Sequence, residues 1–154
     1  MDRLQLLKRL DRAWEAFKAS YVGLSDSELL EPCITGNWSI KDIIAHVTWW
    51  EEEALKHLPI ILAGRKPPRY SVAYGGIDAF NAHMTEQKRN LSLDEVLRQQ
   101  DETHRRLIEF IQTVPEDHIA RETRFRRRLR LDTYSHYPKH AEAIWKWREQ
   151  RSAE

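Results

Sequence analysis

Hydrophobic residues recur at steps of three or four along four stretches of the chain, the spacing that places them on one face of an α-helix. The first stretch spans about Arg3 to Tyr21, and Asp2 with Gln5 forms a capping box at its start. Its apolar positions are Leu4, Leu7, Leu10, Trp14, Phe17 and Tyr21. This pattern predicts a first helix that buries one face.

The second stretch has the clearest helix start. Ser39 is its expected N-cap, and Asp42 stands at the reciprocal capping-box position. The helix is expected to fray near Pro59 or to continue to about Ala63. Its broad apolar face comprises Ile40, Ile43, Ile44, Val47, Ala54, Leu58 and Ile61. At 100° per residue, His46 stands at the edge of this face, with Asp42, Trp49, Trp50 and Glu53 close to it on the helix surface.

The third stretch runs from about Leu93 to Thr113, between a Ser92 cap and Pro115. Its apolar face is interrupted in the middle by three polar residues, Gln100, Thr103 and His104. An unpaired buried polar group costs roughly 1–3 kcal/mol, so the gap predicts water, a ligand or a polar network at mid-helix.

The remaining segments complete an all-α, four-helix-bundle prediction. The connection GRKPPRYSVAYGG, followed by a short helix in IDAFNAHMTEQ, forms a long crossover between the second and third helices. In IARETRFRRRLRLD, apolar residues alternate with arginines, which favours an extended arm lying on the bundle. The last helix is expected to begin near Asp132 or Thr133 and to reach about Arg151.

Composition narrows the class of protein. A chain of 154 residues is expected to form one domain, residues 1–154. The 25 basic and 24 acidic residues nearly cancel, which gives no argument for a nucleic-acid or membrane partner. The single cysteine excludes an internal disulfide, and the amphipathic, charged start is not a signal peptide. A cytoplasmic location is therefore expected.

The strongest chemical pattern is a pair of histidines in the last helix. His136 and His140 are four residues apart, so both imidazoles project from one helix face. Two such nitrogens can bind one borderline metal ion such as zinc, nickel or iron, and His46 is the natural third ligand. Chance placement of two histidines is the alternative, because the spacing alone is a weak signal. Pro138 lies between the pair and would kink the helix if it fell beyond the first turn.

Other polar and aromatic residues are weaker candidates. Glu53 is a candidate base or partner of His46, or simply part of a solvated acidic face. His57 is expected to be exposed. A substrate cavity is expected to be lined by Trp49, Trp50, Gln100, Thr103, His104 and Tyr137. The arginines of residues 121–130 either attract an anionic substrate or form a solvated arm.

Three segments resemble one known family. GNWSIKDIIAHVTWWEEEAL, GGIDAFNAHMTEQKRNLSLDEVL and DTYSHYPKHAEAIWKW are similar, in this order, to segments of the DinB-like superfamily, and particularly of its ClbS/DfsB-like branch. The resemblance implies a four-helix bundle with a long crossover. It also implies a divalent metal held by His46, His136 and His140. It further implies possible use of a low-molecular-weight thiol, and a homodimer.

Together, the histidine pattern and the resemblance predict a metal-dependent enzyme, a hydrolase or thiol-dependent transferase, acting on a small-molecule substrate. The alternative is a non-catalytic protein of the self-resistance type that binds and sequesters a small molecule. A third hypothesis, nucleic-acid binding through the arginines, is disfavoured by the nearly neutral charge. The expectation is therefore that neither nucleic acid nor membrane is a partner.

Overall fold

The computed structural model describes residues 1–153, which fold into helices joined by loops. Within this range there is no β-strand, and only a single bridge joins Thr35 to Trp38. The helices are α1 (Arg3–Tyr21), α2 (Asp26–Leu29), α3 (Ile40–Leu62), α4 (Tyr70–Ala73), α5 (Ile77–Lys88), α6 (Leu93–Thr113), α7 (Arg124–Asp132) and α8 (Tyr137–Ala153). The prediction of an all-α four-helix bundle is confirmed.

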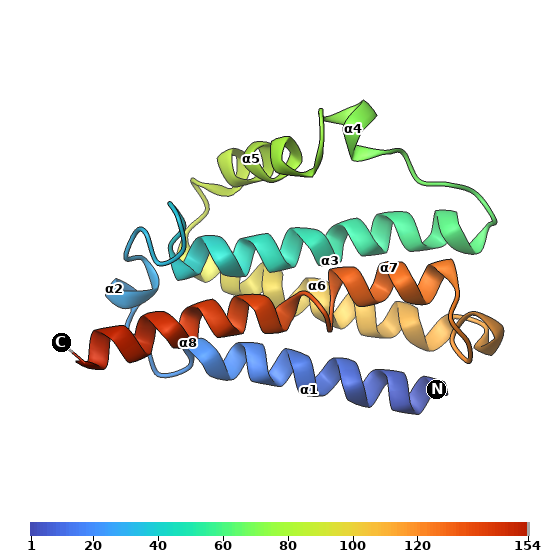
Figure 1. Cartoon of the computed structure of the whole chain (residues 1–154), viewed down its shortest axis with the longest axis horizontal. Coiled ribbons are helices and arrows are strands. Elements are labelled where there is room, and N and C mark those ends of the chain that lie inside the picture. The colour runs from blue at the N-terminus through green and yellow to red at the C-terminus, as the bar shows by residue number, and fades with distance from the viewer. Residues whose placement is uncertain (154) are drawn as a thin grey trace.

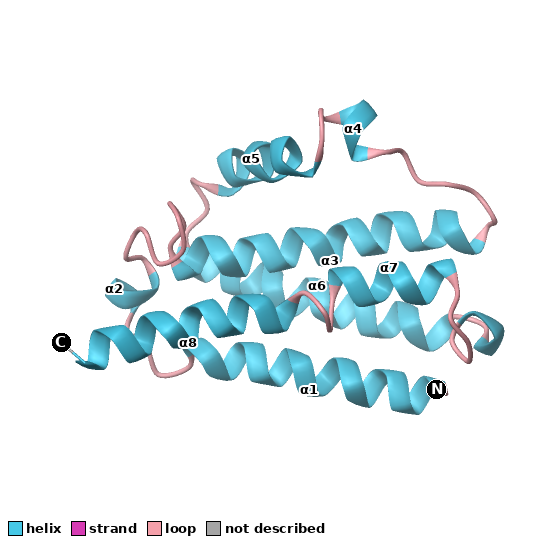
Figure 2. Ribbon diagram, in the orientation of Figure 1, coloured by secondary structure: helices cyan, strands magenta, loops and turns pink. Residues whose placement is uncertain are grey.

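The bundle consists of α1, α3, α6 and a fourth, broken helix made of α7 and α8 (Figure 1). α3 packs against α6 and α7, and α1 packs against α8. The chain follows α3 and α6 in the same direction, so a long crossover must bring it back between them (Figure 1). That crossover contains α4 and α5 and lies along the outside of α3, as Figure 2 also shows.

Helix caps and apolar faces explain these elements. Capping boxes begin α1 at Asp2 and α3 at Ser39, as the sequence predicts. The buried face of α1 comprises Leu6, Leu10, Trp14, Phe17, Ser20 and Tyr21. Leu4, which the apolar pattern assigned to this face, is instead exposed. The core is thus filled by large side chains from all four bundle helices.

The expected extended arm is wrong, because residues 124–132 form the helix α7. Thr123 caps this helix, and Phe125 and Leu129, four residues apart, are fully buried. Leu131, which completed the alternating pattern, is 63% exposed. The helix therefore buries Phe125 and Leu129 on one face, and the arginines lie on its other faces.

The last helix begins later than expected. After α7 the chain makes a turn, and α8 starts at Tyr137 instead of near Asp132. Pro138 is consequently the second residue of α8, within the first turn, where its missing N–H removes no intrahelical hydrogen bond. The proline does not kink the helix that carries His140.

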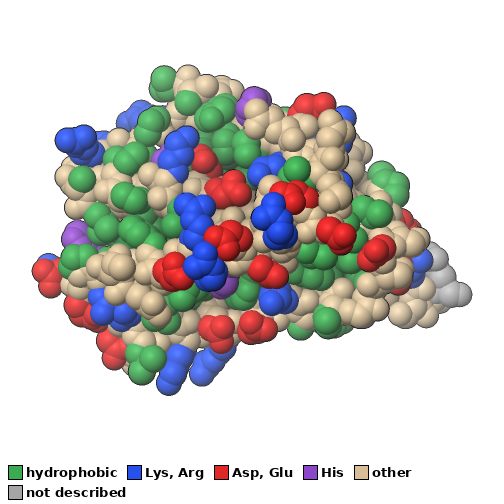
Figure 3. Space-filling model, turned by 180° about the vertical axis from the view of Figure 1, so that it is seen from behind, with side chains coloured by type: hydrophobic (Ala, Val, Ile, Leu, Met, Phe, Trp, Pro, Cys, Tyr) green, Lys and Arg blue, Asp and Glu red, His purple; other side chains and the backbone are tan. Residues whose placement is uncertain are grey.

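The surface is mixed in charge. On the face seen in Figure 3, acidic and basic side chains are interspersed, in keeping with the nearly balanced composition. Several are paired within one helix, such as Arg105 of α6 with Glu102 and Glu109. None of the helices within residues 1–153 combines the length and the apolar character that crossing a membrane requires.

Candidate metal centre and adjoining cavity

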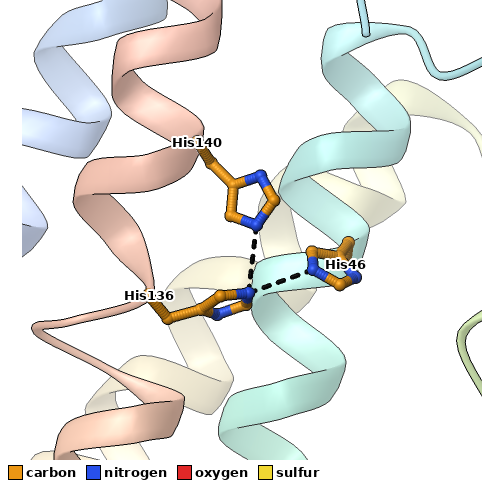
Figure 4. Close-up of side chains that lie close together, drawn as sticks. All are labelled: His46, His136 and His140. Carbon is orange, nitrogen blue, oxygen red and sulfur yellow. Dashed lines mark hydrogen bonds between the residues drawn. The ribbon is translucent and has the colours of Figure 1, made fainter. Parts of the chain in front are cut away.

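Three histidines from distant parts of the sequence meet between α3 and the start of α8 (Figure 4). His46 lies on α3, His136 in the turn before α8, and His140 in the first turn of α8. The Nε2 atom of His136 is 3.0 Å from Nε2 of His46 and 3.0 Å from Nε2 of His140. The break between α7 and α8 is what turns His136 toward the other two rings.

All three imidazoles are neutral at pH 7. Burial lowers the pKa of His46 to about 2, and repulsion from His136 and His140 adds to the shift. Burial, followed by His140 and Lys139, lowers the pKa of His136 to about 3. The pKa of His140 falls to about 4, again chiefly through burial. Neutral imidazole is the form that binds a metal ion.

The arrangement fits a shared divalent ion. Two imidazole nitrogens that each lie about 2.1 Å from one ion are roughly 3.0–3.4 Å apart, and the observed spacings are within that range. Each neutral imidazole carries only one N–H, and Nδ1 of His46 is buried without a partner among residues 1–153. Hydrogen bonds among the three rings therefore leave polar atoms unsatisfied, whereas a cation would be bound by all three Nε2 lone pairs.

Aromatic side chains hold His46 in place. The ring centroid of Trp38 lies 4.6 Å from that of His46, and the Trp49 ring stands perpendicular to it at 4.9 Å. Trp49 is 1% exposed and His46 is 5% exposed. These walls desolvate the imidazole, which is the main cause of its lowered pKa.

A cavity of about 410 Å³ adjoins the histidines, between α3, the α7–α8 segment and the crossover. This volume falls in the range of small-molecule sites. The cavity is lined by His46, Trp50, Tyr70, Ile77, Asn81, Arg128, Leu131, Asp132, His136 and Lys139. Two of the three histidines therefore stand in its wall, together with apolar and cationic side chains.

Tyr70 of α4 fastens the crossover over this cavity. Its hydroxyl donates to Oε1 of Glu53 at 3.1 Å and accepts from Arg128 at 2.8 Å. Arg128 in turn donates through Nε to Asp132 at 2.6 Å. Burial raises the pKa of Asp132 to about 6, although Arg128 opposes the shift. The crossover is thus held by a polar network that reaches both α3 and α7.

The polar residues that interrupt the apolar face of α6 do not line this cavity. Gln100, Thr103 and His104, which were expected in its wall, lie instead in the bundle core. Gln100 donates to the Tyr21 hydroxyl, and Nδ1 of His104 lies 2.9 Å from Oε2 of Glu51. Trp14 stacks on His104 with its ring centroid 3.8 Å away. The gap therefore marks a polar network across the core.

Glu51 is the member of this core network that the sequence analysis missed. It is fully buried, and burial raises its pKa, with the hydrogen bond from His104 opposing. Its second oxygen neighbours the buried Tyr137 hydroxyl, but neither atom makes a regular hydrogen bond within the described part of the chain. A signal was present, because Val47, Glu51, Ala54 and Leu58 follow the helical spacing of the core face. Tyr137, expected in the cavity wall, is also in this core.

The other residues considered in the sequence analysis lie in different surroundings. Trp50 lines the cavity, whereas Trp49 is buried beside it. Glu53 lies with Tyr70 and His57 in the network that fastens the crossover. The expectation that His57 is exposed is wrong, since it is 3% exposed and burial lowers its pKa to about 4.

A family model places the chain among known proteins. The model of the DinB superfamily matches residues 9–142. A search of curated proteins finds no match. The sequence resemblance to this superfamily is confirmed.

Solved structures share the fold. The sibling lethal factor precursor DfsB has a TM-score of 0.80 and 17% identity, over 98% of this chain and 97% of that chain. The colibactin self-resistance protein ClbS, in complex with double-stranded DNA, has a TM-score of 0.79 and 15% identity, over 96% and 95%. An uncharacterised protein from Escherichia coli UTI89 has a TM-score of 0.79 and 12% identity, over 98% and 95%. At these identities the likeness shows the fold alone.

These comparisons correct two predictions. The neighbour with a stated function, ClbS, is a self-resistance protein, which favours the alternative of a non-catalytic binding protein over the predicted hydrolase or thiol transferase. The expectation that nucleic acid is not a partner is also wrong, because ClbS holds double-stranded DNA on this fold.

Proposed function

The chain belongs to the DinB superfamily, and from this premise we propose that it is a small-molecule-binding protein of the self-resistance type, which sequesters its guest beside a divalent metal ion. The observation that carries the proposal is the position of His46 and His136 in the wall of the 410 Å³ cavity. A guest in that cavity lies against the metal site.

His46, His136 and His140 would hold the ion, which is zinc, nickel or iron by the preference of imidazole ligands. A bound ion would supply Lewis acidity, drawing an oxygen or nitrogen group of the guest toward itself. The protein's own part is to exclude water and to orient the guest. Trp50 provides an apolar wall, and Tyr70 keeps the crossover closed over it.

Thermal shift with a small-molecule library tests the proposal. Compounds are expected to stabilise the zinc-loaded protein and to be recovered unchanged by mass spectrometry after denaturation. Ile77→Trp should fill the cavity from its exposed rim and abolish the stabilisation. The matched control is Val72→Trp, at an exposed crossover residue outside the cavity. Absence of any stabilising compound, equal stabilisation in both variants, or chemical conversion of the compound would overturn the proposal.

Binding of double-stranded DNA is a second candidate, supported by exposed basic residues at the start of the crossover and on α7. This set, called the patch below, consists of Arg65, Lys66, Arg69, Arg124 and Arg127. All five are exposed, and none makes an ion pair with an acidic side chain of residues 1–153. Arg124 donates to the Arg65 carbonyl at 2.9 Å, which joins the crossover to α7. Exposed, unpaired cations are the groups that bind phosphates.

Fluorescence anisotropy with a labelled duplex tests this candidate. Affinity should fall steeply between about 50 and 200 mM salt, as counterion release requires. The double variant Arg124→Glu/Arg127→Glu should weaken binding at least about tenfold. Lys8→Glu/Arg12→Glu on α1 makes the same charge change at exposed positions away from the patch. Equal weakening by both variants, or no binding at low salt, would eliminate the candidate.

A further inference from the structure

The amide of Asn81 has a fixed orientation at the edge of the cavity. The indole Nε1 atoms of Trp49 and Trp50 lie 3.3 and 3.0 Å from Oδ1 of Asn81. An indole N–H donates and cannot accept, so the atom between the two rings must be the carbonyl oxygen. The Asn81 NH₂ group is thereby turned away from the indoles, and no partner for it is found within residues 1–153.

Two cations line the same cavity as Asn81. Arg128 uses Nε for Asp132 and Nη2 for Tyr70, which leaves Nη1 without a partner in the described chain. Lys139 is exposed, lines the cavity and has no ion pair there. Both groups donate and neither accepts. Among the described lining residues the one carboxylate is that of Asp132, which is already paired with Arg128.

The cavity therefore presents donors in excess of acceptors. Its lining includes two cationic side chains, Arg128 and Lys139, against the single carboxylate of Asp132 within the described residues. Apolar side chains line the cavity beside these donors. Ile77 and Leu131 are 55% and 63% exposed, and Trp50 is a further apolar lining residue. Exposed apolar groups beside convergent donors are typical of a ligand site.

We propose that the guest is a small organic acid, whose carboxylate accepts hydrogen bonds from Asn81 and Arg128 and whose apolar body lies on Trp50, Ile77 and Leu131. The inference rests on the proposed function, because it assigns the chemical class of the molecule bound in the same cavity. Asn81 acts as a specificity residue, since its donor group is what distinguishes a carboxylate from an amine.

Binding of 3-phenylpropionate, measured by titration calorimetry or saturation-transfer NMR, tests the class of guest. The matched probe 3-phenylpropylamine has the same apolar body and the opposite charge. The acid is expected to bind both the zinc-loaded and the chelator-treated protein, and the amine to bind neither. Asn81→Asp keeps an oxygen that accepts from both indoles but removes the NH₂ donor. The affinity for the acid should fall at least about tenfold, which is the effect of losing one charge-assisted hydrogen bond.

Asn90→Asp is the control, because it makes the same change at an exposed residue of the crossover outside the cavity. Near-ultraviolet circular dichroism of the tryptophans checks that Asn81→Asp is folded. Should it unfold, Lys139→Gln, with Lys146→Gln as control, replaces it, and a two- to fivefold loss of affinity is expected. Lys139 and Lys146 are both exposed on α8.

The proposal is overturned if the amine binds as well as the acid, or if the variant binds the acid as tightly as its control. Binding of the acid only when zinc is present, unchanged in Asn81→Asp, also overturns it, because the ion would then hold the carboxylate. In each case the library compounds that stabilise the zinc-loaded protein would still support the proposed function. If no library compound stabilised the zinc-loaded protein but the acid still bound, the proposed function would be overturned and the inference about the acid would not.

Discussion

The Nε2 atoms of His46 and His136 lie 3.0 Å apart, although ninety residues separate them in the chain. One imidazole comes from the second turn of α3 and the other from the turn that breaks the fourth bundle helix. Neither helix alone brings these atoms together. The contact exists because α3 packs against α7 and the chain then turns into α8.

Removing any one histidine of the cluster should abolish tight metal binding. His46→Ala, His136→Ala and His140→Ala each leave two nitrogens, so zinc or nickel affinity should fall at least about 100-fold. Metal content after dialysis, measured by mass spectrometry, checks this. His83→Ala, at an exposed histidine of the crossover, should retain about one ion per chain. Equal metal content in all four variants would place the ion elsewhere.

The metal-free protein should lose stability as the pH falls below about 6.5. Folding lowers the pKa values of the three histidines from the ordinary histidine value of 6.5. Below about pH 6.5 the unfolded chain therefore binds more protons than the folded protein does. The contribution of each histidine to stability is therefore complete above about pH 6.5 and declines toward its folded pKa, by up to roughly 1.4 kcal/mol per pH unit.

Urea unfolding between pH 7 and 4.5, in the presence of a chelator, measures this slope. A variant with glutamine at all three positions keeps polar side chains that do not titrate, and it should show a shallower decline. If the two proteins lose stability in parallel, the cluster is not the source of the acid sensitivity.

The helices with clear caps were predictable to within a residue. Ser39 with Asp42 and Ser92 with Glu95 mark starts that the structure retains. The helix at residues 124–132 could not be predicted in this way, because Phe125, Leu129 and Leu131 satisfy both an alternating and a partly helical pattern. Only packing against α3 decides between them, and it buries Phe125 and Leu129 but not Leu131.

The site was less accessible to prediction than the fold. The histidine spacing and the helix edge at His46 indicated the cluster, because these are local properties of two helices. The cavity wall depends on how the crossover docks, so nothing local in the sequence indicated Tyr70, Asn81 or Arg128. Glu51 followed the core spacing, but the two acidic residues that follow it, Glu52 and Glu53, favoured a solvated face.

Glu51 should tolerate loss of its charge better than loss of its side chain. Glu51→Ala leaves His104 without its partner and opens a cavity in the core, and should cost about 2–4 kcal/mol. Glu51→Gln keeps the shape and removes a buried charge, so the change should be under about 1 kcal/mol. Urea unfolding compares them. Glu52→Ala, which removes a partly exposed pair with Lys88, should cost at most about 1 kcal/mol, and a similar loss for Glu51→Ala would contradict the network.

Tyr70→Phe should loosen the crossover without unfolding the bundle. The lost hydroxyl leaves Arg128 and Glu53 short of a partner, a cost of about 1–2 kcal/mol. Hydrogen exchange should speed up in residues 65–90 and remain unchanged in α1 and α6. Tyr74→Phe is the control, because no hydrogen bond is found for the Tyr74 hydroxyl among residues 1–153. Uniform acceleration over the whole chain would mean that Tyr70 stabilises the bundle itself.

Pro138 should be nearly dispensable for the metal site, although it stands between two of the three histidines. It is exposed and occupies the first turn of α8, where no intrahelical hydrogen bond to its nitrogen is missing. Pro138→Ala should lower the free energy of unfolding by only about 0.5 kcal/mol, through the freer unfolded chain, and should change zinc affinity less than about threefold. Pro68→Ala in the crossover is the control for the entropic effect, and competition with a zinc chelator gives the affinity. A tenfold change in zinc affinity confined to Pro138→Ala would mean that the proline sets the angle between His136 and His140.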